Sequence, residues 1–221
     1  MACIMLLIIP GERYPLTMDA EEWVGKAHSA LNRGRPDEAV EAYDHALVVA
    51  PERADIWELR GDALSSLGRI DEAFSSYDQA IVADRERVSP YFKKGYLLRK
   101  AGRFEESLVP LDTALAIDPH YTYALNSMGY SLNELQRYKD ALIFLDRSLA
   151  INPRNMKVIT AKGIALRETK QFQEAIRCFD RALEFNALNA FVYYNKSLAL
   201  RAMGLTEEAD EVIRFINRPW N

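Results

Sequence analysis

The sequence repeats itself every 34 residues. Residues 103–119, RFEESLVPLDTALAIDP, match residues 137–153, RYKDALIFLDRSLAINP, in residue type along their length, and QFQEAIRCFDRALEFN begins a third version at Gln171. A helix pair of this length cannot bury its apolar face alone, so tandem copies are expected to stack into one elongated array. The copies align without insertion from residue 20, which predicts a leader, 1–19, and six repeats: 20–53, 54–87, 88–121, 122–155, 156–189 and 190–221.

Small and large residues occupy fixed positions in each repeat. Small residues hold the eighth position, which is Ala27, Gly61, Gly95, Gly129, Gly163 and Ser197, and the twentieth, which is Ala39, Ala73, Ser107, Ala141, Ala175 and Ala209. Large apolar residues hold the fourth position (Trp23, Trp57, Tyr91, Leu125, Ile159 and Tyr193) and the twenty-fourth (Tyr43, Tyr77, Leu111, Leu145, Phe179 and Ile213). Positions 4 and 8 share one face of a helix, as do positions 20 and 24. The pattern therefore predicts two helices that approach closely at the small residues.

Glycine and proline mark the ends of these helices. A glycine follows the first helix at Gly34, Gly68, Gly102 and Gly204, where it can adopt a left-handed conformation. Repeats close near Pro51, Pro119 or Pro153, while Arg85, Ala187 and Asn221 stand at the corresponding position in the others. Pro110 falls within the second helix of the third repeat and is expected to kink or delay that helix.

This pattern resembles the tetratricopeptide repeat (TPR), and the resemblance covers residues 20–221. It implies an all-α fold, a right-handed superhelix (α-solenoid) of six helix–turn–helix repeats, that acts as a non-catalytic scaffold for protein binding. The phrase CFDRALEFN and a basic seventh position are similar to microbial members of the family. The basic residues are Lys26, Arg60, Lys94, Lys162 and Lys196.

The family resemblance also implies that positions 2, 5, 6, 9, 12 and 13 line a concave groove. These positions are acidic in the first two repeats, but aromatic, basic or asparagine in the others, which suits a protein or peptide with acidic and apolar groups. The alternative is that the tyrosines simply pack along adjacent helices. The candidate groove residues are Phe92, Lys93, Tyr96, Tyr123, Asn126, Tyr130, Asn133, Lys157, Thr160, Arg167, Tyr194 and Asn195.

One specific kind of TPR groove is not expected. TPR co-chaperones that bind the acidic tails of heat-shock proteins hold them in a carboxylate clamp of lysine and asparagine over three repeats. Lys93 and Lys157 match single positions of that clamp, but the neighbouring positions do not follow it. The sequence therefore does not predict a dicarboxylate-clamp co-chaperone.

Charge and motifs give no support to other classes of protein. The formal net charge is −4, which disfavours nucleic-acid binding. Residues 20–87 hold 15 Asp and Glu against 8 Lys and Arg, whereas residues 88–221 hold 15 against 19. No catalytic, metal-binding or nucleotide-binding motif is present, so we expect neither enzyme activity nor a cofactor. The apolar run from Ile4 to Ile9 is too short to span a membrane, and the cysteines Cys3 and Cys178 suit the cytoplasm.

The two ends of the array raise the alternative of self-association. The final helix carries Val212, Ile213 and Ile216, and Trp220 follows it, without a polar capping helix. Such an apolar edge could join copies into a homo-oligomer. The leader could fold over the first repeat, insert into the groove of a neighbour, or remain disordered.

Overall fold

The computed structural model describes residues 18–216, and these form twelve α-helices without a strand. The helices alternate between two kinds. The first helices of the pairs are α1 (Ala20–Asn32), α3 (Ala54–Ser66), α5 (Val88–Lys100), α7 (Thr122–Glu134), α9 (Met156–Glu168) and α11 (Ala190–Ala202). The second helices are α2 (Pro36–Val49), α4 (Ile70–Ala83), α6 (Phe104–Ile117), α8 (Tyr138–Ile151), α10 (Phe172–Phe185) and α12 (Thr206–Ile216). This confirms the predicted all-α helix–turn–helix architecture. The predictions on residues 1–17 and on Trp220 lie outside the described residues.

The two helices of a pair touch at the small residue of position 8. A Cβ atom on Gly129 would lie 2.5 Å from Cδ2 of Leu145, and one on Gly163 would lie 2.6 Å from Cε1 of Phe179. Both bulky partners occupy position 24 and are fully buried. The absence of a side chain at position 8 is therefore what lets the position 24 side chain fill the space between the helices.

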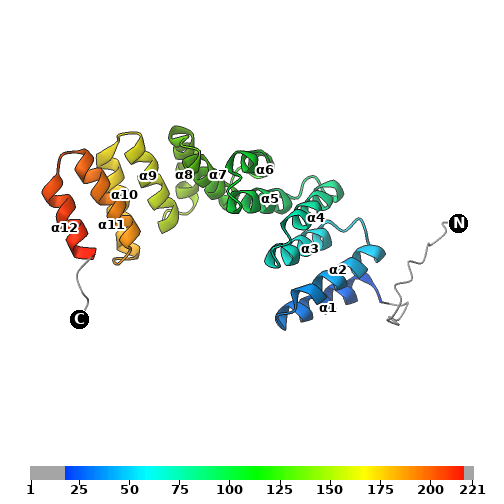
Figure 1. Cartoon of the computed structure of the whole chain (residues 1–221). Helices are drawn as coiled ribbons and strands as arrows, with labels where there is room; N and C mark the ends of the chain where they lie inside the picture. The colour runs from blue at the N-terminus through cyan, green and yellow to red at the C-terminus, as the bar shows by residue number, and fades with distance from the viewer. Residues whose placement is uncertain (1–17, 217–221) are drawn as a thin grey trace. The chain divides into compact units, whose positions relative to one another are not determined.

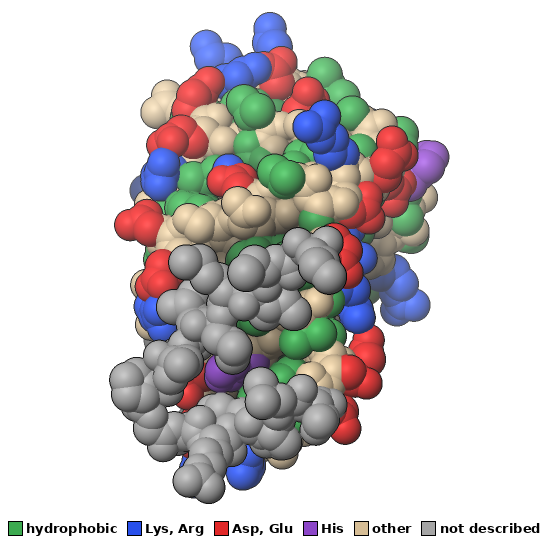
Figure 2. Space-filling model, turned by 90° about the vertical axis from the view of Figure 1, so that its right-hand side faces the viewer, with side chains coloured by type: hydrophobic (Ala, Val, Ile, Leu, Met, Phe, Trp, Pro, Cys, Tyr) green, Lys and Arg blue, Asp and Glu red, His purple; other side chains and the backbone are tan. Residues whose placement is uncertain are grey.

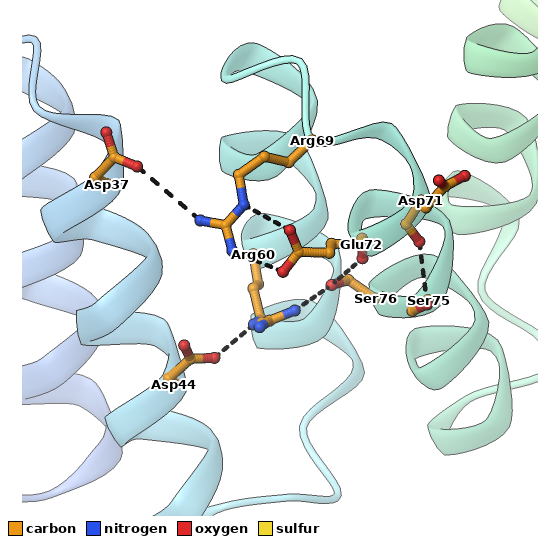
Figure 3. Close-up of polar contacts among 8 residues, drawn as sticks. All are labelled: Asp37, Asp44, Arg60, Arg69, Asp71, Glu72, Ser75 and Ser76. Carbon is orange, nitrogen blue, oxygen red and sulfur yellow. Dashed lines mark hydrogen bonds and ion pairs between the residues drawn. The ribbon is translucent and has the colours of Figure 1, made fainter. Parts of the chain in front are cut away.

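The chain divides into two compact blocks, which are described separately: α1–α4 and α5–α12. In the N-terminal block, α2 packs against α3 and joins the two helix pairs (Figure 1). Charged side chains reinforce this contact, as Figure 3 shows. Arg60 donates from Nε to Asp44 on α2 and from a terminal nitrogen to Ser76 on α4. Arg69 pairs with Glu72 at 2.6 Å and lies 4.0 Å from Asp37.

In the C-terminal block, the first helices contact one another in sequence order, α5 with α7, α7 with α9 and α9 with α11 (Figure 1). The core between the pairs is continuous, since Leu149 packs against both of its main clusters. One cluster centres on Leu125 and Leu145, and the other on Ile159 and Phe179. This arrangement leaves one face of the row of first helices available to form a site.

Pro110 does not delay the start of its helix, and the helix continues through it. Helix α6 begins at the same repeat position as the other second helices and runs through the proline to Ile117. Ser107 and Leu111, on either side of it, are fully buried. Their packing offsets the loss of one backbone hydrogen bond, which is why the expected delay is not observed.

In every repeat, one residue of the turn after the first helix has a left-handed backbone conformation. Glycine provides it at four of the turns, with φ between 71° and 82°. In the fourth and fifth repeats the residues are Gln136, with φ 59°, and Lys170, with φ 64°. A side chain is strained in this conformation, so these two turns differ from the rest in stability.

On the face of the molecule in Figure 2, acidic and basic side chains lie interspersed, with apolar side chains between them. No helix in the described part of the protein combines the length and the apolar character that are needed to cross a membrane.

Candidate functional site

The C-terminal block contains a groove of about 840 Å³ along its first helices. Residues from α5, α7, α9 and α11 line it, together with the first residues of α6 and α8 and residues from the turns. Most of the lining residues occupy positions 2, 5, 6, 9, 12 or 13 of their repeats. The lining comprises Arg99, Lys100, Phe104, Tyr130, Asn133, Glu134, Gln136, Tyr138, Met156, Lys157, Thr160, Ala161, Ile164, Arg167, Glu168, Asn189 and Phe191.

Five of the predicted residues lie in this groove: Tyr130, Asn133, Lys157, Thr160 and Arg167. Their side chains differ in what they can offer. Lys157 is exposed, whereas the hydroxyl of Thr160 donates to the carbonyl of Met156 in its own helix. The amide nitrogen of Asn133 donates to the carbonyl of Ala161 on α9, and its Oδ1 is buried without a hydrogen-bond partner in the described part of the protein. Asn133 therefore ties two repeats together and keeps an unused acceptor.

Three further predicted residues, Phe92, Tyr96 and Tyr123, form an aromatic cluster with Tyr121. The ring of Phe92 lies 5.8 Å from those of Tyr96 and Tyr123 and 5.4 Å from that of Tyr121. Tyr96 and Tyr123 are 41% and 65% exposed, so the cluster presents rings to solvent while Phe92 packs against the core. Part of this aromatic surface thus packs along adjacent helices, which is the alternative raised from the sequence.

The predicted asparagines Asn126 and Asn195 are occupied within the protein. Oδ1 of Asn126 accepts a hydrogen bond of 2.5 Å from Ser148 on α8. Asn195 is buried, its Nδ2 donates to the carbonyl of Phe191, and its Oδ1 accepts from Arg167 at 2.7 Å. Neither residue lines the groove, and each forms a hydrogen bond to a neighbouring helix.

The remaining predicted residues, Lys93 and Tyr194, also lie outside the groove lining. Lys93 is half-buried on α5, and Tyr194 is 54% exposed on α11.

Arg99 of the groove lining lies against two aromatic rings. Its guanidinium carbon lies 5.1 Å from the ring centroid of Tyr96 and 5.5 Å from that of Tyr130, and both rings sit within cation–π range. Burial raises the pKa of Tyr130 to about 12, and the positive charge of Arg99 opposes this shift. Tyr130 is therefore a neutral hydrogen-bonding ring at physiological pH.

The groove carries more positive than negative side chains. Its lining includes four cationic residues and the carboxylates of Glu134 and Glu168. Arg167 is paired with Glu168, but no ion pair or hydrogen bond engages the side chains of Arg99, Lys100 or Lys157 within residues 18–216. The electrostatic potential of the groove accordingly favours an acidic ligand.

The groove positions predicted from the sequence, all of them on first helices, do not include every residue that lines the groove. Phe104 and Tyr138 line the groove from position 17, the first residue of the second helix. Burial raises the pKa of the Tyr138 hydroxyl, and Glu168 adds to this effect. An aromatic residue recurs at position 17 in Phe172, so the repeated aromatic was a signal that the sequence contained.

At the end of the C-terminal block, part of the predicted apolar edge is covered. Val212 packs against the core cluster of α9–α12, Ile213 is half-buried, and the ring of Phe215 lies 5.2 Å from that of Tyr193. The side chain of Ile216 and Trp220 lie outside the described part of the protein.

Two of the histidines contact aromatic rings: His45 stacks on Trp23, and His28 meets Tyr43 edge-on. The described residues contain no cluster with the composition of a metal site.

The stacked helix pairs and the groove along their first helices are typical of a helical repeat protein. The protein-family model for the tetratricopeptide repeat matches residues 24–87 and 92–155, and a second model of the same repeat matches residues 157–187. These matches cover more than half of the sequence, and the chain therefore belongs to the tetratricopeptide repeat family. No curated protein matches the sequence.

Several solved structures share this fold. A tetratricopeptide repeat protein from Parabacteroides merdae is 20% identical with a TM-score of 0.76, over 89% of this chain and 78% of that chain. YrrB, described as a TPR protein with an unusual peptide-binding site, is 23% identical with a TM-score of 0.72, over 79% and 90%. PilW, a type IV pilus biogenesis factor, is 22% identical with a TM-score of 0.71, over 87% and 90%. At these identities the likeness concerns the fold.

Proposed function

We propose that this protein is a non-catalytic scaffold that binds a segment of another protein in the groove of its C-terminal block. The observation that carries the proposal is the combination, in one groove, of aromatic rings with three cationic side chains that make no ion pair or hydrogen bond within residues 18–216. Rings such as Tyr130 and Phe191 supply contact area at a small cost in conformational entropy, and the cations attract carboxylates. The peptide-binding site described for YrrB is an example of peptide binding by a protein of this fold.

The groove has the dimensions of a peptide site. Its volume of about 840 Å³ falls within the range of concave ligand sites, and Phe191 is 58% exposed at its edge. An exposed ring contributes little to folding when it stays in water. The aromatic cluster around Phe92 extends along the same helices, α5 and α7, and offers further contact area to a longer segment.

The test compares the intact protein with two double variants. The groove variant is Tyr130→Ala with Lys157→Glu, and both residues line the groove. The control variant is Ile143→Ala with Arg177→Glu, which makes the same change in charge at exposed positions of α8 and α10. All three proteins are first compared by circular dichroism and thermal unfolding, and by sedimentation equilibrium to establish their mass.

Partners captured from a lysate are identified by mass spectrometry, purified, and measured in a two-component binding assay. We expect the groove variant to lose at least about tenfold in affinity, which corresponds to about 1.4 kcal/mol, while the control variant binds as the intact protein does. Equal binding by all three proteins would show that the segment docks elsewhere. A mass that rises with concentration, and falls with Ile213→Glu, would instead favour self-association through the last helix.

A further inference from the structure

Three arginines occupy the same position, the twelfth, in the repeats of the C-terminal block: Arg99, Arg167 and Arg201. Two of them are satisfied by other side chains of the protein. Arg167 donates to Asn195 at 2.7 Å and pairs with Glu168, and Arg201 pairs with Asp210 at 2.6 Å. Arg99 differs, because no carboxylate or other acceptor of residues 18–216 bonds to its guanidinium, and its Nε is buried without a partner.

The unpaired guanidinium is nevertheless held in place. The rings of Tyr96 and Tyr130 lie 5.1 Å and 5.5 Å from its central carbon, on two successive first helices. Fixing a guanidinium in advance reduces the entropy lost when an acceptor arrives. These features are those of a pre-organised anion site, and the exposed Lys100 and Lys157 line the same groove.

We propose that Arg99 anchors a carboxylate of the bound protein segment, with an adjacent apolar side chain packed against Met156, Ile164 and Phe191 of the groove. This proposal rests on the proposed function and adds the chemistry of the partner. A carboxylate matches the planar fork of a guanidinium with two parallel hydrogen bonds. The carboxylate can belong to a glutamate or aspartate side chain or to the C-terminus of the partner.

A protein segment suits this groove better than a nucleic acid does. Glu134 and Glu168 line the groove together with the cations, so a run of phosphates would meet carboxylates along it. The apolar lining residues also have no counterpart on a phosphate backbone. An acidic segment that alternates carboxylates with apolar side chains complements both features.

The experiment uses four fluorescein-labelled peptides and fluorescence anisotropy with the full-length protein. One peptide alternates leucine and glutamate, its partner carries glutamine in place of glutamate, and each is made with a free and with an amidated C-terminus. The protein variants are Arg99→Met, Arg99→Lys, which keeps the charge and loses the planar fork, and Arg201→Met as the matched control. Circular dichroism and thermal unfolding establish that each variant is folded.

We expect the glutamate peptide to bind the intact protein, and to lose roughly tenfold in affinity with Arg99→Met and several-fold with Arg99→Lys. Binding to Arg201→Met stays within about twofold, because that arginine is already paired. The glutamine peptide with an amidated C-terminus binds weakly. Tight binding of the glutamine peptide only when its C-terminus is free would assign the site to a terminal carboxylate.

Three results would overturn the proposal. The first is no binding of any peptide up to millimolar concentration, and the second is equal binding of peptides with and without carboxylates. The third is Arg99-dependent binding of a labelled single-stranded oligonucleotide that exceeds binding of the glutamate peptide. If a natural partner is lost with the Tyr130→Ala and Lys157→Glu variant but retained with Arg99→Met, the scaffold function stands and the role of Arg99 does not.

Discussion

The ammonium group of Lys162 lies 2.6 Å from Oδ1 of Asp146, sixteen residues earlier on the second helix of the preceding repeat. The same contact recurs between Arg60 and Asp44 in the N-terminal block, and between Lys196 and Asp180 further along the C-terminal block. Position 25 of one repeat therefore pairs with position 7 of the next. This ion pair gives a structural reason for the basic residue at position 7. From the sequence alone, that residue indicated only a similarity to microbial members of the family.

One repeat boundary lacks this ion pair and provides an internal control. Asp112 occupies position 25, but the residue at position 7 of the next repeat is Met128, which is buried in the core. We expect Asp146→Ala to lower the free energy of unfolding by about 0.5–1 kcal/mol, because the pair is partly exposed, and Asp112→Ala to change it by less than about 0.5 kcal/mol. Urea unfolding of both variants measures the difference, and equal effects would contradict it.

The strained turns predict stabilising substitutions. Gln136 and Lys170 hold positive φ angles at the turn position where four other repeats have glycine. Gln136→Gly and Lys170→Gly should each raise the free energy of unfolding by about 0.5–1 kcal/mol, since relief of strain exceeds the added freedom of the unfolded chain. Gly102→Ala, at φ 76°, is the reverse control and should destabilise. Thermal unfolding ranks the three variants by stability. A loss of stability in both glycine variants would contradict the hypothesis that Gln136 and Lys170 are strained.

Two helical glycines should respond to alanine in opposite directions. Gly25 has open space around it in α1, so Gly25→Ala should stabilise the protein by about 0.5–1 kcal/mol through helix propensity. Gly129→Ala would place a Cβ atom 2.5 Å from Leu145 and should cost about 1–3 kcal/mol through overpacking. Denaturant midpoints of the two variants should therefore shift in opposite directions. A tolerated alanine at Gly129 would mean that the helices can separate without loss of packing.

The buried hydroxyl of Tyr43 predicts a change in alkaline stability. This hydroxyl has no hydrogen-bond partner within residues 18–216, and burial, followed by the negative charge of Asp62, raises its pKa to about 12. In the unfolded state this tyrosine ionises near pH 10, so the stability from this group is complete below that pH and falls as the pH rises toward 12. Tyr43→Phe should therefore lose less stability between pH 10 and 12.

At neutral pH, Tyr43→Phe should be as stable as the intact protein or more stable by about 1 kcal/mol, because it removes an unsatisfied polar group. The matched control is Tyr77→Phe in the same block, since the hydroxyl of Tyr77 donates to Asp62 at 3.0 Å. Losing that bond should destabilise by about 1 kcal/mol at pH 7. Urea unfolding at pH 7 separates the two tyrosines, and identical changes in stability at that pH would disprove the assignment.

Much of the architecture follows from local pattern alone. The first helices begin at residues 20, 54, 88, 122, 156 and 190, which are the first residues of the repeats aligned from the sequence. The helix positions can be predicted because the spacing of apolar residues and the glycine turns are local features of the sequence. The close approach of a bulky side chain to Gly129 and to Gly163 recurs at the same repeat position. Of the twelve groove residues proposed from repeat positions, five line the groove. Phe104 and Tyr138 also line the groove, but they occupy a repeat position that the proposal did not include.

What the sequence alone determined is the repeat, its length and the faces of its helices. Only the tertiary structure decided which polar groups on those faces are already used. Asn195 and Arg99 both occupy positions on the expected groove face, yet Asn195 is bonded to Arg167 and Arg99 has no acceptor within residues 18–216. The physical reason is that the partner of such a residue comes from another repeat, 28 residues away in the case of Arg167 and Asn195, and depends on side chains that vary from copy to copy.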